Sequence, residues 1–208
     1  MDQIIETYNN KLGADLVSKF TFPAPDPSLK TEDKTLDGVP CRIYTPQGYE
    51  GNKPVCVYFH GGGWAMGDLD GDDGNCRVIS KGAGIVLVSV GYRLAPQHPY
   101  PAPLDDCLTA ANWVLSNASS LSGADGKVIL AGASAGGGLA LGVALKLVDA
   151  GKRDRVVGIV AQVPATVHAD GVPEKYKSGY ESFKKHANDT VNTADAMHTF
   201  WGTSFPFL

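Results

Sequence analysis

The sequence lacks the features that mark several large classes of protein. Its 18 Lys and Arg residues are outnumbered by 22 Asp and Glu residues, and the net charge of −4 carries no basic block. A nucleic-acid partner is therefore not expected. No run approaches the roughly 18 apolar residues that a membrane-spanning helix needs. The first residues, MDQIIETYNN, are acidic and unlike a secretory signal, so we expect a cytoplasmic protein without a membrane span.

Cysteine is scarce, and its spacing points to no metal. The four cysteines are Cys41, Cys56, Cys76 and Cys107. They form no CxxC pair, and we predict buried, reduced thiols. The acidic stretch 67–75 resembles a calcium loop, but Asp73 stands where the invariant glycine should be. We predict an acidic loop there, no metal ion and no cofactor.

The chain does contain alternating strand-like and helix-like segments. Apolar or alternating runs predict strands at 39–45, 54–59, 84–93, 127–134 and 156–165. Helical periodicity appears at 1–20, at 104–118 and in GGLALGVALKLVDAG, whereas 166–200 is polar and only loosely helical. Continuous β-branched runs are typical of strands that are covered on both faces. The alternation favours a doubly wound, mostly parallel α/β sheet in one domain of 208 residues.

A cluster of small residues separates strand 127–134 from the helix that follows it. It reads Gly132-Ala133-Ser134-Ala135-Gly136. A serine between a strand and a helix is the context of a nucleophile elbow. Small neighbours leave room for a strained turn, and the helix start directs its amide groups toward the serine oxygen. Ser134 is the candidate nucleophile, and the alternative is a turn that simply requires small residues.

A second glycine-rich motif, FHGGGW, follows the predicted strand 54–59. Gly61, Gly62 and Gly63 let the backbone approach a ligand and present free N–H groups. With the amide of Ala135 they would surround a developing oxyanion, usually the largest catalytic contribution in acyl transfer. The alternative is a flexible glycine-rich loop.

Together with YRLAP (92–96) and PYPAPLDD (99–106), these motifs resemble the hormone-sensitive-lipase-like family of α/β hydrolases. The resemblance covers roughly residues 35–165. It implies an α/β-hydrolase sheet and the hydrolysis of a small acyl ester or lactone. Ser134 would be the nucleophile, with the oxyanion hole formed by Gly61, Gly62 or Gly63 and by Ala135.

The same resemblance implies how the single domain is divided. Residues 1–30 would form an N-terminal cap segment, 35–165 the sheet core and 166–208 a cap-like segment. No cofactor is implied, and the expected partner is a small-molecule ester or another apolar ligand.

The sequence departs from the family where the rest of the catalytic triad should lie. In this fold the triad follows in the order Ser, then Asp or Glu, then His, on loops after further strands. The residues after Pro164 contain no apolar β run. We therefore expect a C-terminally incomplete hydrolase fold with a partial helical cap, and a truncated product of a longer hydrolase is one interpretation.

A local substitute for the missing base is His168, just past the strand ending near Ala165. The alternative is an exposed loop histidine, because Asp170 is two residues away and that spacing seldom orients an imidazole. A serine hydrolase without its base keeps only about 10³–10⁴-fold acceleration over water. We therefore expect slow ester turnover.

The sequence is also compatible with two other functions and predicts one mode of self-association. The chain could be a non-catalytic small-molecule binding protein, or an eliminating or cyclising enzyme that polarises a carbonyl. Strand 156–165 would be an apolar sheet edge with unpaired N–H and C=O groups, a template for another chain. We expect self-association through this edge or the aromatic tail TFWGTSFPFL (199–208).

Overall fold

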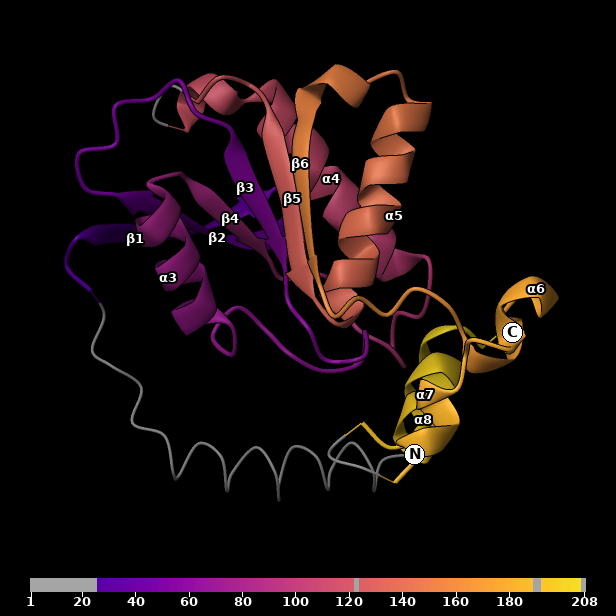
Figure 1. Cartoon of the computed structure of the whole chain (residues 1–208). Helices are drawn as coiled ribbons and strands as arrows, with labels where there is room; N and C mark the ends of the chain where they lie inside the picture. The colour runs from indigo at the N-terminus through magenta and orange to yellow at the C-terminus, as the bar shows by residue number, and fades with distance from the viewer. Residues whose placement is uncertain (1–25, 122–123, 189–191, 207–208) are drawn as a thin grey trace.

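The computed structural model describes residues 26–121, 124–188 and 192–206, and within them the chain forms a six-stranded sheet of order β1-β2-β4-β3-β5-β6 (Figure 1). The strands are β1 (Leu29–Leu36), β2 (Val39–Pro46), β3 (Val55–Phe59), β4 (Leu87–Val90), β5 (Val128–Ala133) and β6 (Val156–Gln162). β1, β2 and β4 pair antiparallel, whereas β4, β3, β5 and β6 run parallel. The predicted mostly parallel sheet is confirmed. The helical period at 1–20 lies outside the described residues.

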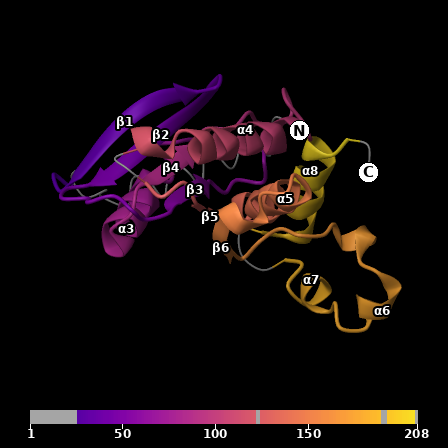
Figure 2. The same cartoon turned by 90° about the horizontal axis from the view of Figure 1, so that it is seen from above.

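Helices cover the two faces of the sheet unequally. They are α3 (Asp73–Ala83), α4 (Ala102–Ser116), α5 (Ala135–Asp149), α6 (Glu174–Lys177), α7 (Ser182–Lys185) and α8 (Ala194–Ser204), with short 3₁₀ turns η2 (Ala118–Ser120), η3 (Arg153–Arg155) and η4 (Ala169–Gly171). α5 packs on β5 and β6 and against α4, while α3 packs on β2 and β4. Seen from above, α4 and α5 lie on one face of the sheet and α3 lies on the other (Figure 2). The arrangement is doubly wound, as predicted.

The core is centred on the middle strands. Every residue of β3 and β4 is buried, which confirms that these continuous apolar runs are covered on both faces. β4 is shorter than the predicted strand 84–93. The four cysteines are free and buried, as predicted.

Sequence reasoning missed the first strand. β1 reads LKTEDKTL and buries only Leu29 and Leu36, so it has no apolar alternation. It forms because Asp37 and Gly38, both with positive φ, make the two-residue turn of a hairpin that pairs Leu36 with Val39. The Asp37-Gly38 pair is a common sequence for a two-residue hairpin turn, and it was the feature from which β1 could have been predicted.

The prediction of an acidic loop over 67–75 was wrong at its C-terminal end. α3 begins at Asp73. The Asp73 carboxylate accepts hydrogen bonds from the Arg77 side chain at 2.6 Å and from the Tyr44 hydroxyl at 2.8 Å. An acidic residue in the first turn of a helix interacts favourably with the helix dipole. Asp73 therefore stabilises the beginning of α3 rather than a loop.

The segment after β6 is helical and lies beyond the carboxyl ends of β5 and β6 (Figure 1). It contains η4, α6, α7 and α8, in agreement with the loosely helical prediction. β6 is an outer strand of the sheet. Among the described residues, no helix has the length and apolar character to cross a membrane.

Candidate active site

Ser134 occupies a strained turn between β5 and α5. Its φ of 53° and ψ of −117° are rare for a residue with a side chain. The turn is held from both sides: Ser134 N donates to Gln162 O at 2.9 Å, and Ser134 O accepts from Ala165 N at 3.0 Å. The hydrogen bonds to β6 and to the chain after it therefore maintain the backbone conformation that a nucleophile elbow needs.

The backbone packs so closely around Ser134 that the neighbouring glycines leave no room for a side chain. A Cβ atom built on Gly132 would lie 2.3 Å from Gly136 O, and one built on Gly136 would lie 2.0 Å from Phe59 O. Both distances are far below contact distance. The strand and the helix approach so closely here that only glycine fits, which explains the small residues on both sides of Ser134.

The HGGGW loop reaches the same place from β3. Gly62 and Gly63 have φ of 115° and 60°, and Gly62 O accepts from Met66 N at 2.9 Å, so the loop folds back on itself. Within the part of the chain that the structure describes, the N–H groups of Gly62, Gly63 and Ala135 donate to no protein acceptor. They are available to a ligand oxygen.

A cavity of about 140 Å³ brings these groups together. Its lining residues are Gly62, Gly63, Trp64, Met66, Ser134, Ala135, Ala165, Asn192, Met197 and Phe200. Gly61 is not part of the lining, but a Cβ built on it would lie 3.7 Å from Ser134 Cβ. The structure therefore places Ser134, Gly62, Gly63 and Ala135 around one space, with Gly61 directly beside it.

His60 supports the glycine loop. Its ring is buried and stacks on Tyr92 with centroids 4.1 Å apart. Nδ1 donates to Gly61 O at 2.7 Å, and the Tyr92 hydroxyl donates to His60 O at 2.8 Å. Burial lowers the pKa of His60, so the ring is held neutral. The interactions fix the loop and leave the ring no access to a substrate.

His168 lies in a neighbouring cavity of about 240 Å³ and does not line that of Ser134. Its Nδ1 accepts from the backbone N–H of Asp170 at 3.1 Å and lies 3.6 Å from the carboxylate Oδ2 of the same residue. The two cavities share Ala165 and Met197. The role of His168 as a base stays a prediction.

The described residues that line the Ser134 cavity include no proton acceptor of the usual kind. Among the described residues, its lining includes no His, Asp or Glu, and Ser134 Oγ makes no hydrogen bond to a side chain. Within the described part of the chain, the structure thus brings together the predicted nucleophile and the predicted oxyanion donors but no base.

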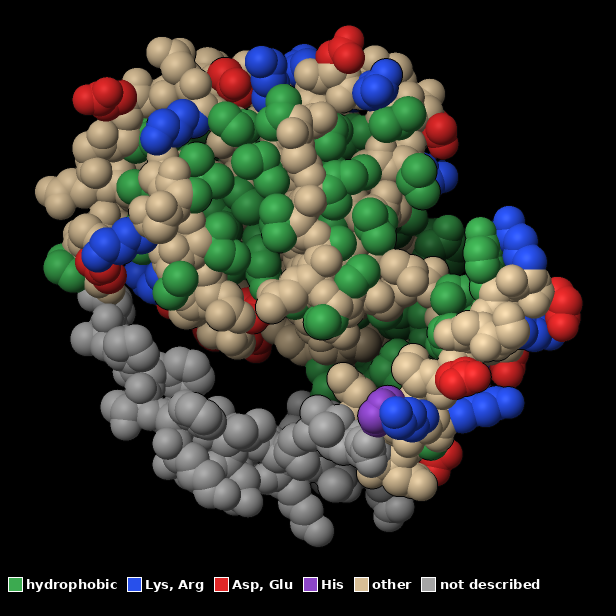
Figure 3. All heavy atoms as spheres, viewed as in Figure 1, with side chains coloured by type: hydrophobic (Ala, Val, Ile, Leu, Met, Phe, Trp, Pro, Cys, Tyr) green, Lys and Arg blue, Asp and Glu red, His purple; other side chains and the backbone are tan. Residues whose placement is uncertain are grey.

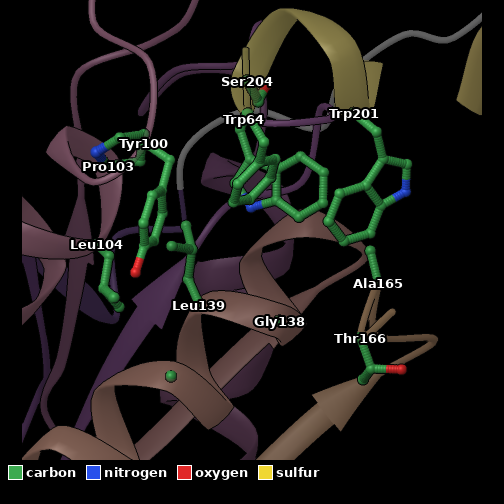
Figure 4. Close-up of a pocket in the computed structure, with 12 residues that line it drawn as sticks. Trp64, Tyr100, Pro103, Leu104, Gly138, Leu139, Ala165, Thr166, Trp201 and Ser204 are labelled. Atoms are coloured by element: carbon green, nitrogen blue, oxygen red, sulfur yellow. The ribbon is translucent and has the colours of Figure 1, made fainter. Parts of the chain in front are cut away.

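A larger apolar pocket of about 270 Å³ adjoins the site (Figure 4). Trp64 and Ala165 line both spaces. Figure 4 shows Trp64 and Trp201 side by side above Leu139, with Tyr100 opposite. The centroids of the Trp64 and Trp201 rings are 4.7 Å apart. This pocket offers an apolar group of a ligand a place next to the serine.

Sequence reasoning missed the contribution of the C-terminal helix. Met197 and Phe200 of α8 line the Ser134 cavity, and the Ser204 hydroxyl donates to Gly63 O at 3.2 Å. The aromatic richness of 199–208 was the available signal, but the sequence analysis related this tail only to self-association. A distant helix can be placed over the glycine loop only once the fold is known.

The comparisons with known proteins agree with this geometry. The sequence profile described as alpha/beta hydrolase fold matches residues 56–206. The chain belongs to that family. The hormone-sensitive-lipase-like resemblance predicted from the motifs is confirmed.

Three similar proteins illustrate the relationship. The versiconal hemiacetal acetate esterase of Aspergillus parasiticus is 44% identical over 201 residues, which are 97% of this chain and 62% of that protein. The carboxylesterase NlhH of Mycobacterium tuberculosis is 45% identical over 193 residues, or 90% of this chain and 58% of that one. The crystal structure of vibralactone cyclase superposes with a TM-score of 0.82 at 27% identity, covering 97% of this chain and 62% of that chain. The chain thus spans about three-fifths of the length of these relatives.

Proposed function

We propose that this chain acts on a small carboxylic ester or lactone through Ser134 as nucleophile. The observation that carries the proposal is the shared cavity, in which the serine meets the free N–H groups of Gly62, Gly63 and Ala135. The names of two relatives, a hemiacetal acetate esterase and a carboxylesterase, support ester hydrolysis. The cavity volume of about 140 Å³ suits a short acyl group such as acetyl.

The chemistry follows from the positions of these groups. Ser134 Oγ would attack the carbonyl carbon and lose its proton, and the carbonyl oxygen would take up negative charge against the N–H groups of Gly63 and Ala135. The tetrahedral species would expel the alcohol, which takes a proton, and leave an acyl-serine for water to hydrolyse. The step that this arrangement does not assist is removal of the Oγ proton.

A second candidate is a non-catalytic binding protein for an ester or a similar apolar ligand. The specific observation in its favour is that no titratable side chain lines the described cavity, while an apolar pocket adjoins it. The two functions differ in whether Ser134 reacts.

Labelling with a fluorophosphonate decides between them. We expect intact-mass spectrometry to show one adduct on the wild-type chain, with the label on Ser134 in peptide digests. Ser134→Ala should remove the adduct, and Ser119→Ala, a serine of η2 that lines none of the described pockets, should retain it. A wild-type chain that stays unlabelled while folded would overturn the hydrolase proposal and favour the binding protein.

The rate of hydrolysis tests the predicted absence of a base. We expect p-nitrophenyl acetate turnover to be slow, because only the oxyanion hole and binding contribute, about 10³–10⁴-fold over water. His168→Ala should change this rate by less than about twofold, because the ring does not line the Ser134 cavity. Fast turnover that His168→Ala abolishes would show that His168 is the base.

A further inference from the structure

We propose that His168, Asp170 and His198 form a binding site for a divalent transition-metal ion of the zinc type. The three side chains offer one ligand atom each, and these atoms all lie within 4.8 Å of one another. Two imidazole nitrogens and a carboxylate oxygen are a donor set that zinc accepts, with a fourth position left for water. His198 is distant in sequence from His168 and Asp170, and the fold brings the three together.

The distances between the donor atoms are compatible with a bound ion. His168 Nδ1 and Asp170 Oδ2 are 3.6 Å apart, and two ligands at zinc bond lengths in a tetrahedral shell are separated by about 3.4 Å. The third donor, at up to 4.8 Å from the others, needs a shift of up to about 1.4 Å to complete that shell. His198 makes this shift available, since its side chain is exposed on α8.

The hydrogen bond of His168 leaves a lone pair on the ring nitrogen that faces Asp170. Because Nδ1 accepts the Asp170 N–H, it carries a lone pair and the ring proton is on Nε2. An ion at Nδ1 would replace that hydrogen bond and would meet the Asp170 carboxylate on the same side. Asp170 keeps an 81% exposed side chain, so the ion can enter from solvent.

Aromatic side chains pack against both imidazoles. The His168 ring packs edge-on against Trp201 at 5.6 Å and lies 5.4 Å from the His198 ring, while His198 packs edge-on against Phe183 at 5.6 Å. Side chains fixed by packing lose less freedom when they coordinate an ion. The site is therefore partly pre-organised.

The cysteines and the Asp73 carboxylate are less suitable metal ligands. The four cysteines are buried, and burial raises the pKa of the Cys56 thiol to about 12. Asp73 is engaged by Arg77 and Tyr44. Among the described residues, His168, Asp170 and His198 are the group of three potential ligands whose donor atoms lie within 4.8 Å of one another.

Such an ion would connect two segments at the active site. Residues 168–170 belong to the chain just after β6, and His198 follows Met197, which lines both the Ser134 cavity and the neighbouring one. The ion would therefore link α8 to the segment that follows β6.

The test is calorimetric titration of the untagged protein with Zn²⁺. We expect one saturable equivalent, with affinity lowered about tenfold or more in His198→Ala and in Asp170→Asn. Asp170→Asn keeps the backbone N–H bond to His168. His98→Ala, which removes an exposed histidine far along the chain, should bind as the wild type does.

A second readout uses the wild-type chain alone. Bound Zn²⁺ should protect His168 and His198, but not His98, from modification by diethyl pyrocarbonate, as peptide mass spectrometry would show. Absence of saturable binding, equal affinity in all variants, or protection that does not favour His168 and His198 would each overturn the proposal.

Discussion

At the scale of single residues, the site depends on glycines, because a Cβ atom at these positions would clash with neighbouring backbone atoms. Gly136 is the sharpest case, since an added Cβ would lie 2.0 Å from Phe59 O and 2.4 Å from His60 O. Both neighbours are backbone atoms of the strand that leads into the HGGGW loop, so neither can rotate away. The elbow and the loop must therefore separate if Gly136 gains a side chain.

We predict that Gly136→Ala lowers the free energy of unfolding by about 1–3 kcal/mol or more, the usual effect of overpacking. Urea unfolding followed by circular dichroism measures it. Gly74→Ala is the matched control, because an added Cβ there has no neighbour within 4 Å and alanine favours the helix by up to about 1 kcal/mol. Equal stability of the two variants would contradict the close approach.

A second prediction at this scale concerns the buried ring of His60. Burial holds its pKa below the ordinary value of 6.5, so between the two pKa values the unfolded chain binds more protons than the folded one. Stability due to this group is complete above about pH 6.5 and falls as the pH drops below it, by at most about 1.4 kcal/mol per pH unit. His60→Asn, which cannot be protonated, should show a smaller loss between pH 7.5 and 5. Parallel pH profiles for wild type and variant would refute the assignment.

At the scale of elements, the predictable parts were those with a clear apolar period. β3 and β5 were predicted to within a residue or so at each end, because burial on both faces demands continuous apolar runs. β1 and α3 were missed for the opposite reason, since both are held by polar contacts at the sheet margin. Arg42, for example, donates to Asp33 of β1 at 2.6 Å and to Asp73 of α3 at 3.4 Å. Such pairings join segments far apart in sequence and leave no periodic signal.

The link between β4 and α4 gives an element-scale prediction. Asp106 is 8% exposed and accepts from Arg93 Nη2 at 2.8 Å and from Arg93 N at 2.9 Å. Arg93→Ala should lower the free energy of unfolding by about 1–3 kcal/mol, because a largely buried carboxylate loses its charged partner. Thermal unfolding measures the effect. Asp105→Ala, on the exposed side of the same helix turn, should shift the midpoint by much less, and an equal shift would contradict the argument.

At the scale of the whole molecule, the sequence located half of the active site. The nucleophile and oxyanion donors lie on two loops with strong local motifs, and the structure places them in one cavity. The wall formed by Met197 and Phe200 could not be predicted, because it depends on how a distant helix folds back over the sheet. The same tertiary dependence applies to the pairing of His168 with His198.

The outer strand of the sheet has an apolar surface that a lone chain leaves exposed. Val157 of β6 is 50% exposed and Val160 is 59% exposed. These two side chains point to opposite faces of the strand, so the packing of α5 on β6 leaves apolar surface exposed on both. Figure 3 shows hydrophobic side chains gathered over β5 and β6 on the viewed face. Strands of this composition are ordinarily covered on both sides. The edge also offers unpaired backbone N–H and C=O groups.

We therefore predict self-association through β6, by antiparallel pairing of two copies about a twofold axis. Sedimentation velocity at micromolar concentration should show a mass that rises with concentration. Val160→Lys should shift the chain toward monomer, because a charge on an edge strand opposes pairing. Val78→Lys is the matched control: Val78 is 74% exposed on α3, away from the edge, and this change should leave association intact. A wild-type chain that remains monomeric with low binding of an apolar dye would show that the edge is stable unpaired.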